Sequence, residues 1–110
     1  MADAFDVIVV FMTAGNRDEA TRLAEMLIDE ELVACVQILP EIESIYRWQG
    51  RIERQPEILI IAKTTQSVFQ QLEARVRAEH SYETPEIVAV PLAAGSSPYL
   101  DWLSSNVKQP

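Results

Sequence analysis

The sequence contains little cysteine and little positive charge. Cys35 is the only cysteine, so one chain can form neither an intrachain disulfide nor a cysteine-only metal site. Lys and Arg together number 9 against 17 Asp and Glu, which gives a formal net charge of −8. Because such a chain repels phosphate backbones and anionic lipid headgroups, we expect it to bind neither nucleic acid nor membranes.

Long apolar segments are also missing. The longest strictly apolar run, Val7 to Met12, is far shorter than the about 20 residues that a membrane-spanning helix needs. The first residues carry neither a basic nor a long apolar segment, so we expect no signal peptide. Together with the single cysteine, this predicts a reducing, cytoplasmic location. The 110 residues, 48% of them hydrophobic, predict a single domain over 1–110.

Hydrophobic periodicity predicts a strand and then a helix in the first part of the chain. Phe5 to Met12 is nearly all apolar and rich in β-branched residues, which is typical of a central strand covered on both faces. Asn16 and Glu19 have the spacing of an N-cap and its capping-box partner. Behind them, apolar residues recur at helical spacing, at Ala20, Leu23, Ala24, Leu27 and Ile28.

A long β-hairpin is predicted next. Leu32 to Trp48 and Arg51 to Thr64 have strand character, and Gln49-Gly50 is a plausible two-residue turn. In that register Trp48 lies opposite Arg51 and Tyr46 opposite Glu53. Pro40 indicates an edge strand or a bulge in the first arm, and Pro56 interrupts the second arm.

The remaining elements complete a known topology. We expect a helix over Ser67 to Glu79, a loop over 80–85, a strand over Glu86 to Leu92 and a short helix starting at Ser97-Pro98 and docked by Tyr99, Leu100 and Leu103. The order βαββαβ plus one helix predicts an α+β, ferredoxin-like sandwich with strand order 4-1-3-2.

We expect this topology to gather the chemically active side chains at one edge of the sheet. If the first and third strands run parallel, their carboxyl ends meet the starts of the second and fourth strands. The residues placed at that edge are Met12, Thr13, Cys35, Lys63, Thr64, His80, Tyr82 and Glu86. A soft metal such as copper, a small anion on the helix N-termini and Lys63, or general-base chemistry at His80 could use this edge.

Each of these residues also has a structural interpretation. These are core packing for Met12 and Cys35, a helix-end hydrogen bond for His80, a solvated charge for Glu79, an ion pair for Lys63, and packing or interface contacts for Tyr46 and Trp48. No short catalytic, phosphate-binding or multi-histidine motif is present, and no nucleophile–base pair is visible. We therefore do not expect an enzyme.

The predicted hairpin is much longer than the first strand, so its arms should overhang the sheet. An overhanging ribbon exposes apolar side chains and unpaired backbone groups, and an isolated two-stranded ribbon is marginal in water. We therefore expect a homo-oligomer built on this hairpin. In the alternative, the two prolines fold the ribbon back onto its own domain.

Several ordered blocks of the sequence resemble the divalent-cation tolerance protein family, CutA. They are Glu31 to Val36, Ser44 to Ile52, Ile61 to Thr64, His80 to Ile87 and Tyr99 to Leu103. The resemblance extends over nearly the whole chain. It implies a homotrimer of ferredoxin-like subunits, related in architecture to the PII signalling proteins, and a role in tolerance of copper and other divalent metals.

The resemblance also implies a metal site. Family members with a copper site have a cysteine before the threonine that ends the first strand, and two adjacent histidines in the later loop. Those positions are Met12, Glu79 and His80 in this sequence, and Cys35 matches a second family cysteine. The leading hypothesis is therefore copper or another divalent cation bound at His80, helped by Met12, Glu79 or Cys35, without turnover.

Two alternatives stay open. In one, the chain is a PII-like regulatory module that binds a small anion in an inter-subunit cleft. The residues assigned to that cleft are Lys63, Tyr82, Glu86, Tyr46 and Trp48. In the other, the chain is a bare scaffold whose assembly surface is its function.

Overall fold

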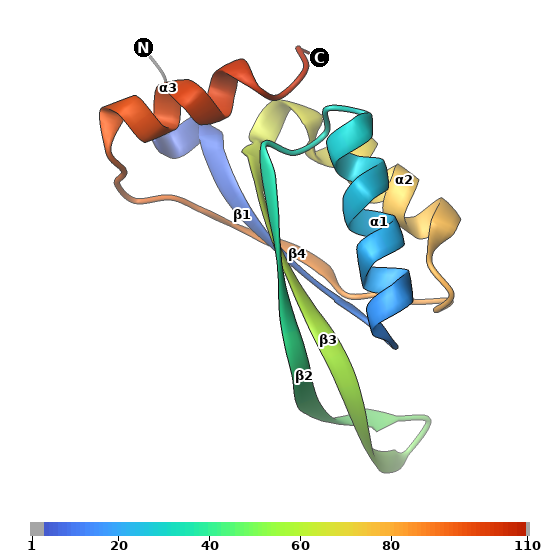
Figure 1. Ribbon diagram of the computed structural model, residues 1–110. Helices are drawn as coiled ribbons and strands as arrows, with labels where there is room; N and C mark the ends of the chain where they lie inside the picture. The colour runs from blue at the N-terminus through green and yellow to red at the C-terminus, as the bar shows by residue number, and fades with distance from the viewer. Residues whose placement is uncertain (1–3, 110) are drawn as a thin grey trace.

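The computed structural model describes residues 4–109. Its elements are η1 (Ala4–Asp6), β1 (Val7–Ala14), α1 (Arg17–Asp29), β2 (Cys35–Trp48), β3 (Arg51–Thr65), η2 (Gln66–Val68), α2 (Phe69–Glu79), β4 (Ile87–Pro91) and α3 (Ser97–Ser105). This is the predicted βαββαβ order with an added C-terminal helix (Figure 1). No helix in residues 4–109 is long and apolar enough to cross a membrane.

The sheet has the predicted strand order, β2-β3-β1-β4, but the predicted directions of β2 and β3 relative to β1 are wrong. β1 and β3 are antiparallel, with Val7 opposite Thr65 and Ala14 opposite Ile58. The reason is that β1 and β2 run parallel and β3 lies between them, so β3 runs against both. The end of β1 therefore meets the start of β4, at Met12 and Ile87, and not the end of β3.

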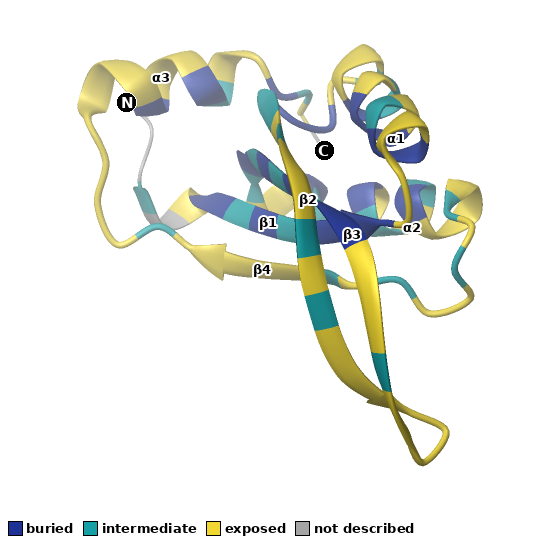
Figure 2. Ribbon diagram, turned by 60° about the horizontal axis from the view of Figure 1, so that its bottom comes forward, coloured by how far each residue is buried: buried dark blue, intermediate teal, exposed yellow. Residues whose placement is uncertain are grey.

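The core lies between one face of the sheet and the helices (Figure 2). Asn16 accepts a 2.8 Å hydrogen bond from the backbone N–H of Glu19, so the predicted N-cap of α1 is confirmed. The helix buries Leu23 and Leu27 fully, whereas Ile28 is 46% exposed, so its predicted place in the apolar stripe is wrong. Truncating either buried leucine to alanine should lower the free energy of unfolding by about 2–5 kcal/mol.

The opposite face of the sheet carries exposed apolar side chains. Val88 and Val90 of β4 are 53% and 47% exposed, and they pair in register with Phe11 and Val9 of β1. Apart from its first residue, Ile87, β4 is exposed (Figure 2). Helices α1 and α2 cover the other face of the sheet (Figure 1), whereas Tyr99 of α3 contacts Cys35, which lies in register with Val90 on this face.

The β2–β3 hairpin projects beyond the rest of the molecule (Figure 1). Gln49 and Gly50 have positive φ values of 50° and 80°, which fits the predicted two-residue turn. A register shift follows Leu39, at the predicted bulge beside Pro40. Pairing of β3 with β1 ends at Ile58, so the outer arms pair only with each other. The alternative in which the ribbon folds back on its own domain is therefore wrong.

Helix α3 packs at the end of the sheet where β1 begins. It spans Ser97–Ser105, and Leu100 and Leu103 are buried as expected. Tyr99 is 40% exposed, and its hydroxyl lies 3.7 Å from Sγ of Cys35, so it contacts the start of β2 without being buried.

Candidate functional site

An acidic cleft opens between the outer arms of the hairpin and the loop that precedes β4. Its volume is about 660 Å³. It is lined by Thr13, Ser44, Ile45, Tyr46, Trp48, Glu53, Gln55, Glu57, Tyr82, Glu83, Thr84 and Glu86. The lining thus includes four glutamates and three aromatic side chains, and none of the described lining residues is Lys, Arg or His. The cleft therefore favours a positively charged occupant.

Glu57 is the buried carboxylate of this cleft. Only 7% of the residue is exposed, and Oε2 accepts a 2.8 Å hydrogen bond from the hydroxyl of Tyr82. Burial and this hydrogen bond to Glu57 raise the pKa of Tyr82, so its hydroxyl stays protonated and donates. Among residues 4–109, no Lys, Arg or His forms an ion pair with Glu57.

Glu86 lies in the same negatively charged cleft. Partial loss of hydration in the cleft, followed by the negative charge of Glu57, raises the pKa of the Glu86 carboxyl. A bound cation would stabilise both ionised carboxylates. The raised pKa of Glu86 therefore agrees with the acidic lining of the cleft in favouring a cation.

His80 holds the loop beside the cleft in place. Its Nε2 donates a 2.8 Å hydrogen bond to the carbonyl oxygen of Thr13, and its Nδ1 accepts a 3.0 Å hydrogen bond from the backbone N–H of Tyr82. The side chain is fully buried, so both nitrogens serve the structure.

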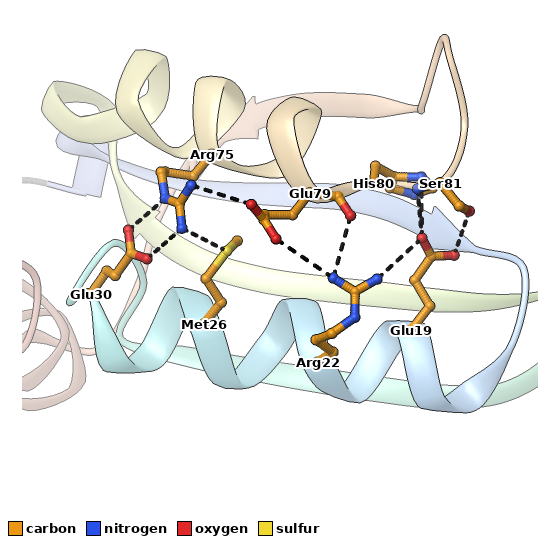
Figure 3. A network of polar contacts seen from close by, with 8 residues as sticks. All are labelled: Glu19, Arg22, Met26, Glu30, Arg75, Glu79, His80 and Ser81. Atoms are coloured by element: carbon orange, nitrogen blue, oxygen red, sulfur yellow. Dashed lines mark hydrogen bonds and ion pairs between the residues drawn. The ribbon is translucent and has the colours of Figure 1, made fainter.

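Glu19 fixes the same loop from the start of α1 (Figure 3). Its carboxylate accepts hydrogen bonds from the backbone N–H and the hydroxyl of Ser81, at 2.7 and 2.9 Å. Burial alone would raise the pKa of Glu19, but these bonds, the nearby His80 and the N–H of Gly15 lower it. Because Tyr82 follows Ser81 directly, this network also positions the cleft hydroxyl.

The charge of Glu79 is shared between two arginines on the outer side of this network (Figure 3). Its carboxylate lies 3.9 Å from Arg22 and 3.7 Å from Arg75. Arg75 also donates two hydrogen bonds to Glu30, at 2.9 and 2.8 Å, which joins α2 to α1. Glu79 is therefore part of the helix–helix contact.

The structure does not bring the four predicted metal ligands together. Met12 is fully buried in the core and pairs with Ile60 and Ile87. Cys35 pairs with Lys63, toward the end of the sheet where β1 starts, whereas His80 contacts Thr13 near the end of β1. No three His, Cys, Asp or Glu residues in the described part of the chain are grouped closely enough to hold a metal ion. The predicted common edge is wrong for Cys35 and Lys63, because β1 and β3 are antiparallel. Met12 and His80 do lie near the end of β1, where it meets the start of β4.

The predicted small-molecule residues are brought together with one exception. Tyr46, Trp48, Tyr82 and Glu86 all line the cleft. Lys63 does not, because its Nζ donates a 3.1 Å hydrogen bond to Gln37 nearer the other end of the sheet.

The sequence reasoning missed Glu53 and Glu57 as site residues. The predicted hairpin register already placed Tyr46 opposite Glu53, as the structure confirms. Side chains two and four positions along a strand share one face, so Gln55 and Glu57 follow on that side. Glu57 could have been predicted by following the hairpin register from the turn toward the sheet.

The chain is similar to known proteins over nearly its whole length. A family model described as CutA1 divalent ion tolerance protein matches residues 8–106. The chain belongs to the CutA1 family. The divalent-cation tolerance protein CutA of Thermus thermophilus is 47% identical over 98 residues, which cover 89% of this chain and 95% of that protein. A solved structure of the divalent cation tolerance protein from Thermus thermophilus matches with a TM-score of 0.91 at 45% identity, and covers 93% of this chain and 99% of that one.

The plant relative is a longer protein. The chloroplastic CutA protein of Arabidopsis thaliana is 43% identical over 101 residues, or 92% of this chain. The match spans only 56% of the plant protein's own length. The similarity to CutA1 structures agrees with the predicted α+β, ferredoxin-like fold.

Proposed function

We propose that this CutA1-family chain contributes to divalent-cation tolerance by holding hydrated divalent cations, copper(II) among them, in the acidic cleft. It would act in the cytoplasm as a homotrimer and bind without turning over a substrate. The observation that carries the proposal is the buried Glu57 carboxylate, which faces the cleft without a cationic partner among residues 4–109. An unpaired buried charge is costly, and a cation in the cleft offsets that cost.

The donor chemistry of the cleft suits this role. Hard cations such as Mg²⁺ and Mn²⁺ bind carboxylate oxygens and keep several of their waters, so one or two carboxylates are enough to hold them. Glu57 and Glu86 provide such a pair, since the charge of Glu57 acts on Glu86. Copper(II) binds nitrogen and oxygen sites most tightly among the divalent first-row metals, so it should bind more tightly here than Mn²⁺.

Binding without turnover is supported by the state of the one histidine. A general base needs a free ring nitrogen within reach of its substrate. Both nitrogens of His80 are engaged by Thr13 and Tyr82, and the ring is buried.

A homotrimer is supported by two apolar surfaces. Trp48 and Ile52 near the hairpin tip are 47% and 60% exposed, and the open face of the sheet exposes Val88 and Val90. Exposed apolar surfaces of this kind are typical of subunit interfaces.

Calorimetric titration with Mn²⁺ and Cu²⁺ tests the cation site. The variant Glu86→Gln should weaken both ions by about tenfold, which corresponds to about 1.4 kcal/mol. Glu79→Gln is the matched control, because it removes an exposed carboxylate outside the cleft, and it should leave both affinities unchanged. If Glu79→Gln weakened binding and Glu86→Gln did not, the cleft would be refuted as the cation site, and the metal would bind at the residues beside His80.

The alternative of a PII-like module with a small anionic ligand stays a prediction. The cleft has the size of a small-molecule site, since such sites span about 300–1,000 Å³. The lining is acidic, however, and Lys63 lies elsewhere. These features favour a cation over an anion.

A further inference from the structure

We propose that Met26 of α1 is a modification site, a peroxide-reactive methionine whose sulfoxide is held by the guanidinium of Arg75 on α2. The modification is a two-electron oxidation of the thioether by hydrogen peroxide, which a methionine sulfoxide reductase reverses. The site lies between α1 and α2 (Figure 3), and neither residue lines the acidic cleft. This inference therefore stands or falls independently of the proposed function.

The first argument is the position of the thioether. Met26 packs against the core but is only half-buried, whereas Met12, the other methionine among residues 4–109, is 0% exposed. Susceptibility of a sulfur to oxidation follows its exposure. The proposed trimer uses the hairpin and the open face of the sheet, and Met26 lies on the helix-covered side. Assembly on those surfaces therefore leaves the thioether accessible.

The second argument is the donor that the sulfur faces. Nη2 of Arg75 donates a 3.4 Å hydrogen bond to Sδ of Met26, and the same nitrogen donates a 2.8 Å hydrogen bond to Oε2 of Glu30 (Figure 3). A thioether sulfur is only a weak acceptor, whereas a sulfoxide is polar and presents an oxygen. Hydrogen bonds from a charged donor are about twice as strong as neutral ones. Oxidation therefore replaces the weakest bond of this guanidinium with a stronger one.

The oxidation step needs only the peroxide as co-reactant. One lone pair of Sδ accepts the Arg75 hydrogen bond, and the other attacks an oxygen of hydrogen peroxide. The S–O bond forms as the O–O bond breaks, so the sulfur loses the two electrons that the peroxide gains. The departing hydroxide takes the proton from the transferred oxygen and leaves as water. Rotation about the Cγ–Sδ bond of Met26 then turns the new oxygen toward the guanidinium.

The third argument is that Arg75 is held in place without Met26. Its Nε donates a 2.9 Å hydrogen bond to Glu30, and its Nη1 lies 3.7 Å from the carboxylate of Glu79. The sulfoxide oxygen therefore meets a donor that is already positioned. A sulfoxide in an apolar core disrupts packing. At Met26 it should instead leave the contact between α1 and α2 intact.

The experiment is limited treatment of the assembled protein with hydrogen peroxide, followed by peptide mass spectrometry and thermal unfolding. Met26 should be oxidised at least about tenfold faster than Met12, and the Tm of the protein oxidised at Met26 should not fall. Equal oxidation rates at the two methionines would overturn the proposal. So would a fall in Tm of about 4 °C or more on oxidation.

Two variants test whether the guanidinium holds the sulfoxide. In Arg75→Gln, oxidation should lower the Tm by about 4 °C or more relative to the unoxidised variant, because the new oxygen has lost its donor. Arg22→Gln is the matched control, since Arg22 contacts Glu79 of the same network but not Met26, and oxidation there should leave the Tm unchanged. An unchanged Tm in oxidised Arg75→Gln would refute the role of Arg75.

A pair of substitutions at Met26 gives a test that does not depend on the folding of Arg75→Gln. The variant Met26→Gln places a carbonyl oxygen where the sulfoxide oxygen would lie, and Met26→Leu places an apolar group of similar size there. Because Arg75 donates toward this position, Met26→Gln should have a Tm at least as high as that of Met26→Leu. A lower Tm for Met26→Gln would show that the site does not accept the oxygen, and the proposal would fail.

Discussion

The hydroxyl of Tyr82 donates a 2.8 Å hydrogen bond to Oε2 of Glu57, and this bond joins the loop before β4 to strand β3. Among residues 4–109, no other group donates a hydrogen bond to this buried carboxylate. The bond therefore couples the position of the loop to the charge at the floor of the cleft.

Replacing Tyr82 by Phe should lower the free energy of unfolding by about 1–3 kcal/mol, because Glu57 then loses its hydrogen-bond donor. Urea denaturation at pH 7 measures this change. Tyr46→Phe is the matched control, since no described residue hydrogen-bonds to that hydroxyl and the ring is 37% exposed. Equal stabilities of the two variants would contradict the role of the bond.

The Glu19 network should make stability depend on pH. The folded-state pKa of Glu19 is lowered, so the carboxylate contributes stability that is present above its unfolded pKa of about 4.5. That contribution is lost as the pH falls through the lower, folded pKa. Glu19→Gln should therefore cost about 1–3 kcal/mol at pH 7 and progressively less as the pH falls below 4.5.

Denaturation of the wild type and Glu19→Gln at several pH values between 7 and 3 measures this difference. Glu25→Gln, an exposed glutamate on the same helix, is the control and should show no comparable pH dependence. A cost for Glu19→Gln that stays constant over the whole range would mean that the charge of Glu19 does not matter.

Glu86 should show the opposite sign. Its folded pKa is raised, so the neutral carboxyl is favoured in the fold and the ionised form is disfavoured once the pH exceeds that pKa. Glu86→Gln should therefore increase stability at pH 7 by up to about 0.5 kcal/mol, a small effect because the side chain is exposed.

The same Glu86→Gln variant should bind cations less well, so its effects on stability and on affinity have opposite signs. Thermal unfolding in chelator and in Mn²⁺ measures both. A variant that is less stable than the wild type in chelator would contradict the electrostatic account of the cleft.

The trimer can be tested with one pair of substitutions. Ile52 on the hairpin is 60% exposed and Ile28 on α1 is 46% exposed, so neither should destabilise an isolated subunit when changed to Glu. In a trimer built on the hairpin, Ile52→Glu should disrupt assembly and Ile28→Glu should not. Sedimentation should give the wild type about three times the subunit mass of 12.4 kDa.

A wild type that sediments as a monomer would refute the trimer. Disruption by Ile28→Glu but not by Ile52→Glu would place the interface on the helices instead.

Periodicity and turn chemistry were sufficient to predict the elements and the strand order. The Gln49-Gly50 turn fixed the hairpin register, because a two-residue turn determines which residues lie opposite each other. That register placed Tyr46 opposite Glu53, and both residues line the cleft. Element ends were less accurate: η1 occupies Ala4–Asp6, where the sequence predicted the start of the first strand.

The candidate metal site could not be predicted in the same way, because it depended on strand direction. Treating β1 and β3 as parallel moved Lys63 and Cys35 to the edge that holds His80. The pattern of apolar residues also does not reveal which polar groups satisfy each other. Both nitrogens of His80 are used by backbone atoms of Thr13 and Tyr82, and no sequence motif announces those contacts.

The most direct test of the cation-binding cleft is a crystal structure after soaking in Mn²⁺, with anomalous diffraction data to locate the metal. The account predicts an anomalous peak in the cleft, within direct or single-water reach of Glu57 and Glu86. A peak at His80 or Cys35, with none in the cleft, would contradict it.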